Sequence, residues 1–425
     1  MNSSWEKKKK KMSRNMIRSD DSEDKVRQLK YEQARRNRVR FWLVFGIVAA
    51  IVIAAVSAFL VLRFYRYSSY ELKWEKELPA GSFSGYEHFG ENVIKYSHDG
   101  ASYIDRDGKD VWVDTYEMTN PKVYVSGDYA CIYDALGTQI RIYNLTGPSG
   151  TATALMPVTK AVVSENGVCA AIEEDNDASY IKFYKKDGTE LDITIKTRLE
   201  GDGYPSDIAL SPEGTQLIAA FAYIDGGTMK SKVVFYDFSE IGKNIPNRLV
   251  GGFEEPFAGS LVSRVRFVNQ TYSYAVADTG IYVFSSKNVS SPELVKTIET
   301  GEHIESIVNF KNHLGVIYSD LAGPDESDEA DSEEETVMST YRLVVYEPDG
   351  STYFKKEFDD PFDTLTADDA FIYVVGNDNC MILNMHGTVK FSGSVEDPAR
   401  MISHGYMPGN FVFCGSTYMK DYQFK

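Results

Sequence analysis

Two stretches of the sequence decide the fold: SYIDRDGKDVW at residues 102–112 and IKFYKKDGTEL at residues 181–191. In each, a short run rich in β-branched and aromatic residues leads to an Asp-Gly pair, and a second run follows. Asp-Gly between two such runs predicts a β-hairpin, because the tight turn needs a residue that adopts positive φ. This strand-turn-strand pattern is the unit from which the rest of the chain can be read.

The hairpin signal recurs at a steady spacing. Similar turns occur at 107–108, 146–147, 187–188, 349–350 and 386–387. Two further strands with less standard turns, at 232–238 and 281–287, lie between them. The first and last turn glycines are 279 residues apart, and six intervals give a mean repeat of about 46 residues. A repeat of this length with about four strands predicts an all-β fold, the β-propeller.

The spacing divides the chain into seven complete units and one incomplete unit. The complete units are 82–117, 119–156, 157–199, 204–258, 261–299, 302–358 and 362–396. The remaining stretch, 399–425, supplies only three strands, whereas a blade needs four. The segment 70–78 has the pattern of an unpartnered outer strand, and pairing it with 399–425 closes the ring and removes exposed edges. The count predicts an eight-bladed propeller. Seven blades is the alternative, because units one and four are the least regular.

An apolar run precedes the propeller region. Phe41 to Leu62 reads FWLVFGIVAAIVIAAVSAFLVL and contains no charged residue. As a helix, about 22 residues span about 33 Å, which matches the hydrocarbon core of a bilayer. A cleavable signal peptide is the alternative, since Val56-Ser57-Ala58 is a passable cleavage site. The long tail before the run, and its apolar continuation to Leu62, favour an uncleaved transmembrane helix.

The two sides of this run differ in charge. Residues 1–40 hold 14 Lys plus Arg and six Asp plus Glu, a net charge of +8. The whole chain carries −17, so subtracting +8 leaves −25 for residues 63–425. The positive-inside rule then predicts a single-pass protein of the cell membrane, with a cytoplasmic N-terminus and an extracytoplasmic C-terminal domain. The basic residues next to the membrane that set this topology are Arg35, Arg36, Arg38 and Arg40.

These features predict the domain boundaries. The chain has a basic cytoplasmic tail at 1–40, a transmembrane helix at 41–62, a stalk at 63–69 and a propeller at 70–425, with an acidic loop insertion at 320–338. The composition of the insertion predicts a mobile loop. The short stalk keeps the propeller close to the lipid, so we expect function at the channel mouth away from the membrane.

The tail itself permits two interpretations. The five lysines at 7–11 belong to a disordered segment attracted to anionic lipid, or they are simple topology-setting charge. Residues 19–24 resemble a helix start, with acidic side chains where the helix dipole favours them, and 25–40 is compatible with a helix that continues into the membrane.

The search for chemistry returns no motif. GxSxG, HExxH, paired CxxC and P-loop patterns are absent, so no catalytic, cofactor-binding or metal-binding residue is predicted. The strongly acidic propeller region excludes nucleic acid as a partner. The four cysteines lie in apolar strand-like runs and are expected to be small buried hydrophobes. The histidines are scattered and give no metal pattern; they are His88, His98, His303, His313, His386 and His404.

The whole arrangement resembles membrane-anchored bacterial β-propeller proteins of unknown function, in the WD40- and PQQ-like repeat superfamily, as in Gram-positive anaerobes. The likeness rests on the basic tail, the single helix, the short stalk and repeats such as those at 102–112 and 181–191. The chain departs from true WD40 repeats because it has no regular Trp-Asp dipeptide. The resemblance implies a propeller and implies no activity.

Two functions follow as expectations. The first is a non-enzymatic, membrane-tethered binding or scaffolding module that holds a protein or an envelope ligand, because loops on a rigid ring carry binding. The second is a cell-envelope hydrolase or lyase, which requires carboxylates or histidines that converge at one mouth of the channel. A sensor that signals through the tail is a third possibility.

Overall fold

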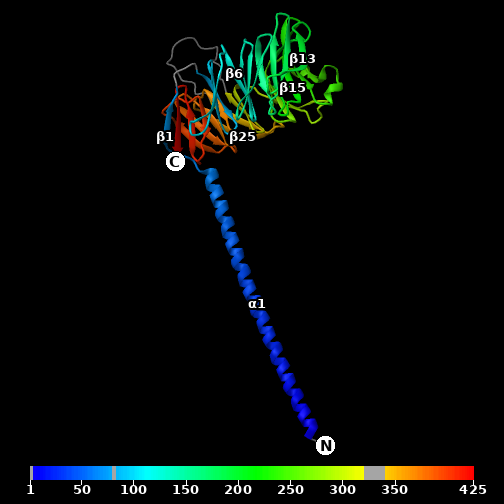
Figure 1. Cartoon of the computed structure of the whole chain (residues 1–425), viewed down its shortest axis with the longest axis vertical. Coiled ribbons are helices and arrows are strands. Elements are labelled where there is room, and N and C mark those ends of the chain that lie inside the picture. The colour runs from blue at the N-terminus through cyan, green and yellow to red at the C-terminus, as the bar shows by residue number, and fades with distance from the viewer. Residues whose placement is uncertain (1–2, 79–82, 320–339) are drawn as a thin grey trace. The chain divides into compact units, whose positions relative to one another are not determined.

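The computed structural model describes residues 3–78, 83–319 and 340–425, and the chain forms two compact units, Met1–Tyr65 and Arg66–Lys425 (Figure 1). The first unit is one helix, α1 (Ser3–Phe64). It contains one candidate membrane span, Arg35–Ser57, with a mean hydropathy of 2.5. This span overlaps the predicted segment 41–62. By length and composition, this helix is long and apolar enough to cross a membrane, and a signal sequence near the N-terminus has the same properties.

The tail differs from its predicted form. We expected a disordered segment or a helix that starts near residue 19, whereas α1 begins at Ser3 and continues without a break into the apolar run. The reason is composition: the chain has no proline or glycine before Gly46, and Lys, Arg, Glu and Gln are good helix formers. The helix is therefore about 93 Å long.

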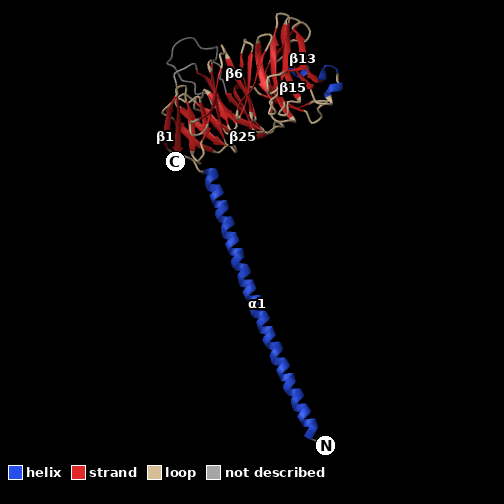
Figure 2. Ribbon diagram, viewed as in Figure 1, coloured by secondary structure: helices blue, strands red, loops and turns tan. Residues whose placement is uncertain are grey.

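The second unit consists of eight four-stranded antiparallel sheets, which confirms the eight-bladed propeller (Figure 2). Each sheet is one blade, and its strands are named a to d from the channel outward. Blade 1 consists of β2 (Phe83–Phe89), β3 (Asn92–Ser97), β4 (Gly100–Ile104) and β5 (Asp110–Thr115), and blade 2 of β6 (Pro121–Ser126), β7 (Tyr129–Asp134), β8 (Gln139–Asn144) and β9 (Gly147–Thr153). Blade 3 consists of β10 (Val158–Val163), β11 (Cys169–Glu174), β12 (Ala178–Tyr184) and β13 (Glu190–Arg198), and blade 4 of β14 (Tyr204–Leu210), β15 (Gln216–Asp225), β16 (Thr228–Asp237) and β17 (Leu249–Phe253).

Blades 5 to 8 complete the ring. Blade 5 consists of β18 (Val262–Phe267), β19 (Tyr272–Ala277), β20 (Gly280–Ser285) and β21 (Glu293–Glu299), and blade 6 of β22 (His303–Phe310), β23 (His313–Ser319), β24 (Tyr341–Tyr346) and β25 (Thr352–Phe358). Blade 7 consists of β26 (Thr364–Ala367), β27 (Phe371–Val375), β28 (Asn379–Asn384) and β29 (Val389–Ser394), and blade 8 of β30 (Met401–His404), β31 (Asn410–Cys414), β32 (Tyr418–Phe424) and β1 (Tyr70–Glu77). Three short 3₁₀ helices flank β17: η1 (Gly242–Asn244), η2 (Pro246–Arg248) and η3 (Glu255–Phe257).

Blade 8 joins the two ends of the propeller. Its outer strand is β1, which pairs antiparallel with β32 from Tyr70 opposite Phe424 to Glu77 opposite Tyr418. This is the pairing that the sequence analysis expects for segment 70–78. The ordered contact begins earlier, because the backbone N–H of Tyr67 donates to the carbonyl of Lys390 at 2.7 Å. Only two residues, 65 and 66, therefore separate the end of α1 from the first propeller contact.

The Asp-Gly turns join strands c and d, as the repeat pattern predicts. In blade 1 the N–H of Gly108 donates to the carbonyl of Asp105, and the N–H of Asp105 donates to the carbonyl of Lys109, both at 2.9 Å. Gly108 has a φ of +74°, so an L-residue with a side chain is strained there. A Cβ at this position would also lie 2.7 Å from the Trp74 ring of blade 8. The turn residue thus fixes both the hairpin and the contact between two blades.

The hydrophobic core lies between neighbouring blades. Strands a, b and c are mostly buried, whereas strand d alternates between exposed and half-buried positions. The four cysteines are buried and free, which confirms the expectation for them: they are Cys131, Cys169, Cys380 and Cys414. The acidic insertion at 320–338 lies outside the described residues, and it connects β23 to β24.

The two faces of the ring carry different connections. The turns between strands a and b, such as 368–370 in blade 7, lie on one face, which we call the a–b face. The connections between strands b and c lie on the other, the b–c face. Strand β1 starts opposite the C-terminal end of β32, so the chain joins the propeller on the a–b face.

Candidate functional site

A polar cavity of about 640 Å³ occupies the channel. The first strands of blades 1 to 7 contribute to its wall, and it extends to the a–b turns, where Asp128, Lys311 and Asp369 are exposed. The cavity lies on the face where the chain joins the propeller. The expectation of function at the mouth away from the membrane stays a prediction.

Arg266 of β18 is the central side chain of the cavity. Its guanidinium lies 4.0 Å from the ring centroid of Tyr124 in β6, so it connects blade 5 with blade 2. Burial disfavours its charge, but the phenols of Tyr124 and Tyr274 and the carboxylate of Asp207 outweigh this and raise the pKa of Arg266. No ion pair to a carboxylate is formed by Arg266 within the described residues. Its positive charge is therefore stabilised mainly by aromatic faces and hydroxyls.

Tyr274 brings further polar groups to the same place. It lies opposite Arg266 in the β18–β19 register, and its hydroxyl donates to Oδ1 of Asn309 at 2.6 Å. Burial raises the pKa of Tyr274, and the charges of Arg266 and Arg264 act in the opposite direction. One phenol thus hydrogen-bonds to an amide and interacts electrostatically with two guanidinium groups. Because the amide oxygen of Asn309 accepts this hydrogen bond, its two N–H donors remain for other partners.

Glu87 of β2 lines the same cavity. Its side chain is exposed to the channel, and protein surrounds the channel at this point. Burial raises the pKa of its carboxyl to about 7, although the charge of Arg266 acts to lower it. Glu87 consequently changes its charge close to neutral pH.

Lys160 shows how a cation in this channel is normally balanced. Its ammonium pairs with the carboxylate of Asp207, which also accepts the backbone N–H of Val265 at 2.8 Å. Asp207 is almost fully buried, so the pair is a structural link between blades 3, 4 and 5. Since Lys160 occupies this carboxylate, Asp207 offers Arg266 only a distant charge.

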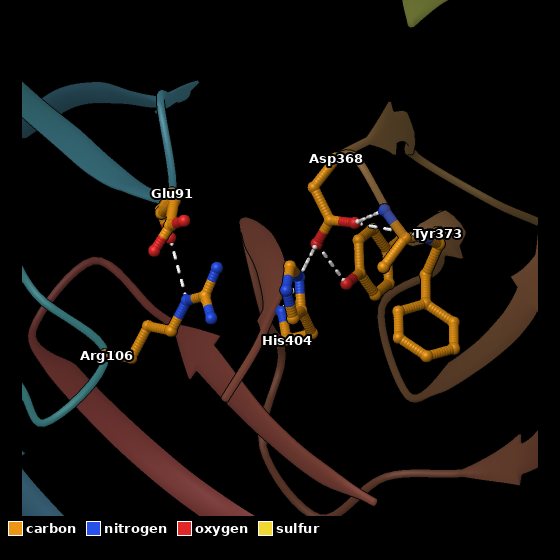
Figure 3. Close-up of polar contacts among 7 residues, drawn as sticks. Glu91, Arg106, Asp368, Tyr373 and His404 are labelled. Carbon is orange, nitrogen blue, oxygen red and sulfur yellow. Dashed lines mark hydrogen bonds and ion pairs between the residues drawn. The ribbon is translucent and has the colours of Figure 1, made fainter. Parts of the chain in front are cut away.

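A second group of polar side chains lies at the rim, around Asp368 in the a–b turn of blade 7 (Figure 3). Its carboxylate accepts five hydrogen bonds. Two come from the backbone N–H groups of Ala370 and Phe371 at 2.8 Å, and one from the hydroxyl of Tyr373 at 2.5 Å. The other two come from Nδ1 of His404 at 2.7 Å and from the backbone N–H of His404 at 3.3 Å. The cluster therefore joins blade 7 to blade 8.

The electrostatics of this rim cluster follow from these contacts. Burial alone would raise the pKa of the Asp368 carboxyl, but the hydrogen bond from His404 and the charge of His88 hold it well below its usual range. Burial lowers the pKa of the His88 imidazole, against the influence of Asp368. Nε2 of His88 is buried and has no hydrogen-bond partner in the structure. It lies with Arg106 along a smaller cavity of about 230 Å³.

Arg106 comes from the c–d turn of blade 1. Its Nε donates to the carbonyl of Glu91 at 2.8 Å (Figure 3). Its guanidinium lies 5.4 Å from the ring centroid of Tyr406. The rim thus combines turns of blades 1, 7 and 8, so the closing blade contributes directly to this mouth.

The structure brings together only some of the residues that the sequence analysis considered. Of the six histidines, His88 and His404 meet at the rim. Nε2 of His313 lies 3.5 Å from Oε2 of Glu347, and both residues belong to blade 6. Nδ1 of His386 in blade 7 hydrogen-bonds to the hydroxyl of Tyr353 in blade 6 at 2.6 Å. Within the described residues, no group of three or more His, Cys, Asp or Glu side chains is arranged to hold a metal ion. The four arginines that were predicted to set the membrane topology are exposed on α1; they are Arg35, Arg36, Arg38 and Arg40.

The sequence analysis missed the residues that build the cavity. Glu87, Arg266 and Asp368 belong to no motif. One signal was available: charged residues at the ends of otherwise apolar first strands are unusual, because these strands enclose the channel.

The eight four-stranded sheets around a polar channel define this protein as a β-propeller. A family model described as a family of unknown function, DUF5711, matches residues 63–424, so the chain belongs to that family. No curated protein matches the chain in sequence.

Several solved structures are similar in fold. Sqt1 of Chaetomium thermophilum, bound to the N-terminus of ribosomal protein L10, is 9% identical over 82% of this chain and 95% of its own, with a TM-score of 0.49. Apo AztD of Citrobacter koseri is 12% identical over 75% of this chain and 86% of its own, with a TM-score of 0.45. The Pan2 WD40 domain of Neurospora crassa is 9% identical over 84% of this chain and 97% of its own, with a TM-score of 0.39.

Proposed function

We propose that this protein is a membrane-tethered, extracytoplasmic binding protein that takes an envelope ligand into the channel cavity on the a–b face. The observation that carries the proposal is the cavity of about 640 Å³, lined by charged groups that include Arg264 and Arg266. Small-molecule sites in proteins commonly occupy about 300–1,000 Å³. The acidic charge of the propeller region argues against nucleic acid as the ligand.

The exposed apolar surface of α1 supports the tether. Phe41 is 65% exposed and Trp42 is 62% exposed, and the run that follows them has the same character. Water is a poor solvent for such a surface, whereas a bilayer core buries it at about 25 cal/mol per Å². With only two residues between α1 and the propeller, the covalent tether reaches no more than about 10 Å.

Protease treatment of intact cells tests the topology. We expect an added protease to remove the propeller and to leave a fragment that contains residues 1–40. The control is permeabilised cells, in which the tail is also degraded. A propeller that is protected until the cells are permeabilised contradicts the extracytoplasmic location.

Site-specific photo-crosslinking in native membranes tests the binding site. A photoreactive residue at the exposed positions Asp128 or Lys311 is expected to capture a ligand, identified by mass spectrometry of the adduct. Lys355, exposed on the outer strand β25, is the matched control position. If the rim positions yield no adduct beyond those found at Lys355, the channel is not the binding site.

A second candidate is a cell-envelope hydrolase or lyase. The observation that favours it is the pairing of Asp368 with His404 at one mouth, next to His88. A carboxylate that orients an imidazole is a recurring part of acid–base catalysis. Turnover of envelope glycans or peptides by the full chain, lost in the variant His404→Gln, would reverse the order of the two candidates. Asp368 itself has too low a pKa to transfer protons at neutral pH.

A further inference from the structure

We infer that the channel cavity recognises an anionic group, such as a carboxylate, phosphate or sulfate carried by a small molecule, between Arg264, Arg266 and Asn309. The inference rests on the proposed function, because it names the chemistry of the ligand at the same site. It follows from three observations: cations without a carboxylate partner, their convergence on one phenol, and the arrangement of the acidic side chains around them.

The first observation is that three cations of the cavity form no ion pair within the described part of the chain. Arg264, Arg266 and Lys311 all line the cavity, whereas the fourth cation, Lys160, is paired with Asp207. Removing a cation from water is costly unless a counter-charge replaces the lost hydration. Arg266 is half-buried; it lies over the ring of Tyr124, and the carboxylates of Asp207 and Glu87 act on its charge without forming an ion pair with it within the described residues. A bound anion supplies the missing counter-charge.

The second observation is geometric. Arg264 and Arg266 are two positions apart on β18, so they project to the same side of the strand. Both influence the phenol of Tyr274, which holds Asn309 through its hydroxyl. Guanidinium forks and a free amide N–H₂ are the donors that bind carboxylate and phosphate oxygens. The exposed ammonium of Lys311, two residues beyond Asn309, adds charge at the rim.

The third observation is that the acidic side chains that line the cavity come from other blades than these donors, and only Glu87 is shown to interact electrostatically with one of them, Arg266. They come from blades 1, 2, 3 and 7: Glu87, Asp128, Glu165, Asp368 and Asp369. Asp368 is saturated by its five donors. The remaining acidic groups lie in a–b turns, except for Glu87 in β2. The cavity is therefore polarised, and a ligand that places its anionic end at blades 5 and 6 has uncharged or cationic atoms toward the opposite wall.

The protonation state of Glu87 is expected to change the affinity of this site for an anion. Burial raises the pKa of Glu87 to about 7, although the charge of Arg266 acts to lower it. Other titratable groups in this region include His88 and Tyr124, which line the same cavity, and Tyr96, on whose pKa the charge of Glu87 acts. Burial lowers the pKa of His88 and raises those of both tyrosines, so these three groups stay neutral near pH 7. An anion beside Arg266 favours the protonated form of Glu87. The affinity of the cavity for the anion is therefore highest below pH 7 and falls as pH rises.

Equilibrium dialysis with radiolabelled sulfate tests the inference on the full chain in detergent micelles. Sulfate keeps its double negative charge across the pH range used, so any pH dependence belongs to the protein. Chloride at equal ionic strength controls for general salt effects. We expect saturable binding of one sulfate per chain, and affinity that weakens by about tenfold between about pH 6 and pH 8.5. Failure to find saturable binding at millimolar sulfate overturns the inference.

Four variants assign the effect to residues. Arg266→Met is expected to weaken sulfate binding by more than about tenfold, and Arg264→Met and Lys311→Met by about three- to tenfold each. The last two side chains are exposed, so these variants keep the fold even if Arg266→Met does not. Lys355→Met removes the same charge from an outer strand and should leave the affinity unchanged. Equal weakening by Lys355→Met would reduce the effect to net charge and overturn the site.

Glu87→Gln separates the proton coupling from binding itself. We expect this variant to bind sulfate at pH 8.5 as tightly as the unaltered chain does near pH 6, with a flat pH profile. An unchanged profile in Glu87→Gln removes Glu87 from the proposal. Rim crosslinks without sulfate binding leave the proposed function standing and refute the anionic class. Sulfate binding without rim crosslinks supports the anion site and counts against an envelope ligand there.

Discussion

The rim cluster around Asp368 and the arginine group around Tyr274 line one channel. They differ in how far the protein itself supplies partners for their charged groups. Asp368 accepts five hydrogen bonds and is almost fully buried. Arg264 and Arg266 have no carboxylate partner within the described residues. Protein donors hydrogen-bond to the carboxylate of the first group, whereas the guanidinium groups of the second are available to bind water or a ligand.

This difference separates a structural role from a binding role. A buried carboxylate with a full set of donors stabilises the contact between blades 7 and 8, and its loss leaves several donors unsatisfied. Cations that face a water-filled cavity contribute little to stability, but they are ready to bind an anion without rearrangement. The two groups therefore predict opposite responses to substitution, in stability for one and in affinity for the other.

The largest expected effect is that of Asp368→Ala on stability. The variant leaves the N–H groups of Ala370 and Phe371 and the side chains of Tyr373 and His404 without their acceptor. We expect the free energy of unfolding to fall by about 3–5 kcal/mol. Urea unfolding of the full chain in micelles, followed by near-ultraviolet circular dichroism, measures it. A loss below about 1 kcal/mol would show that the cluster does not hold the blades together.

The pH dependence of stability sharpens the same prediction. The folded-state pKa of Asp368 is depressed, so its contribution is fully present above the unfolded-state value of about 3.9 and is lost as pH falls through the lower folded-state pKa. Asp368→Asn keeps one acceptor oxygen and cannot titrate. We expect the variant to lose less stability than the unaltered chain between about pH 4 and pH 2. Parallel acid profiles would contradict this.

An intermediate effect is expected for Glu87→Gln. The folded state holds a proton on Glu87 up to a pKa of about 7, whereas the unfolded chain releases it near pH 4.3, so the stability of the unaltered chain falls as pH rises between about 4 and 7. Glutamine removes this loss. Channel water screens the carboxylate, so the gain at pH 8 relative to pH 4 is only about 1 kcal/mol. Thermal unfolding at the two pH values measures it, with Glu91→Gln at the rim as the control.

The smallest expected effect on stability is that of Arg264→Met and Lys311→Met. Both side chains are exposed and make no ion pair within the described residues, so each substitution should change the free energy of unfolding by less than about 0.5 kcal/mol. The same urea experiment measures it. A loss as large as that of Asp368→Ala would show that these cations are structural, and the contrast between the two groups would fail.

Particular elements show how far sequence reasoning reached in the propeller. The turns at 107–108 and 187–188 predicted hairpins because glycine is needed where φ is positive, and the structure has φ of +74° and +85° there. The segment 70–78 was assigned to the closing blade because a three-strand remainder needs a fourth strand. Both arguments use local pattern and counting. The tail was misjudged because charge suggested disorder, whereas helix propensity governs residues 3–40.

The site was out of reach for a physical reason. In five blades the pairing of strands a and b contains a register shift near the start of strand a, as between Val262 and Arg264. Such a bulge moves the following side chains to the other face of the strand, so simple alternation cannot say which charged residue faces the channel. Arg266 was therefore indistinguishable from a surface residue.

The sequence by itself determined the eight blades, the strand that closes the ring and the apolar helix, because turn chemistry, period and hydropathy act over short distances along the chain. Only the tertiary structure decided that Arg266 reaches Tyr124 across the channel and that Asp368 meets His404 at the rim. Those contacts join blades that are far apart in sequence, and they exist because closure of the ring brings all eight first strands around one axis.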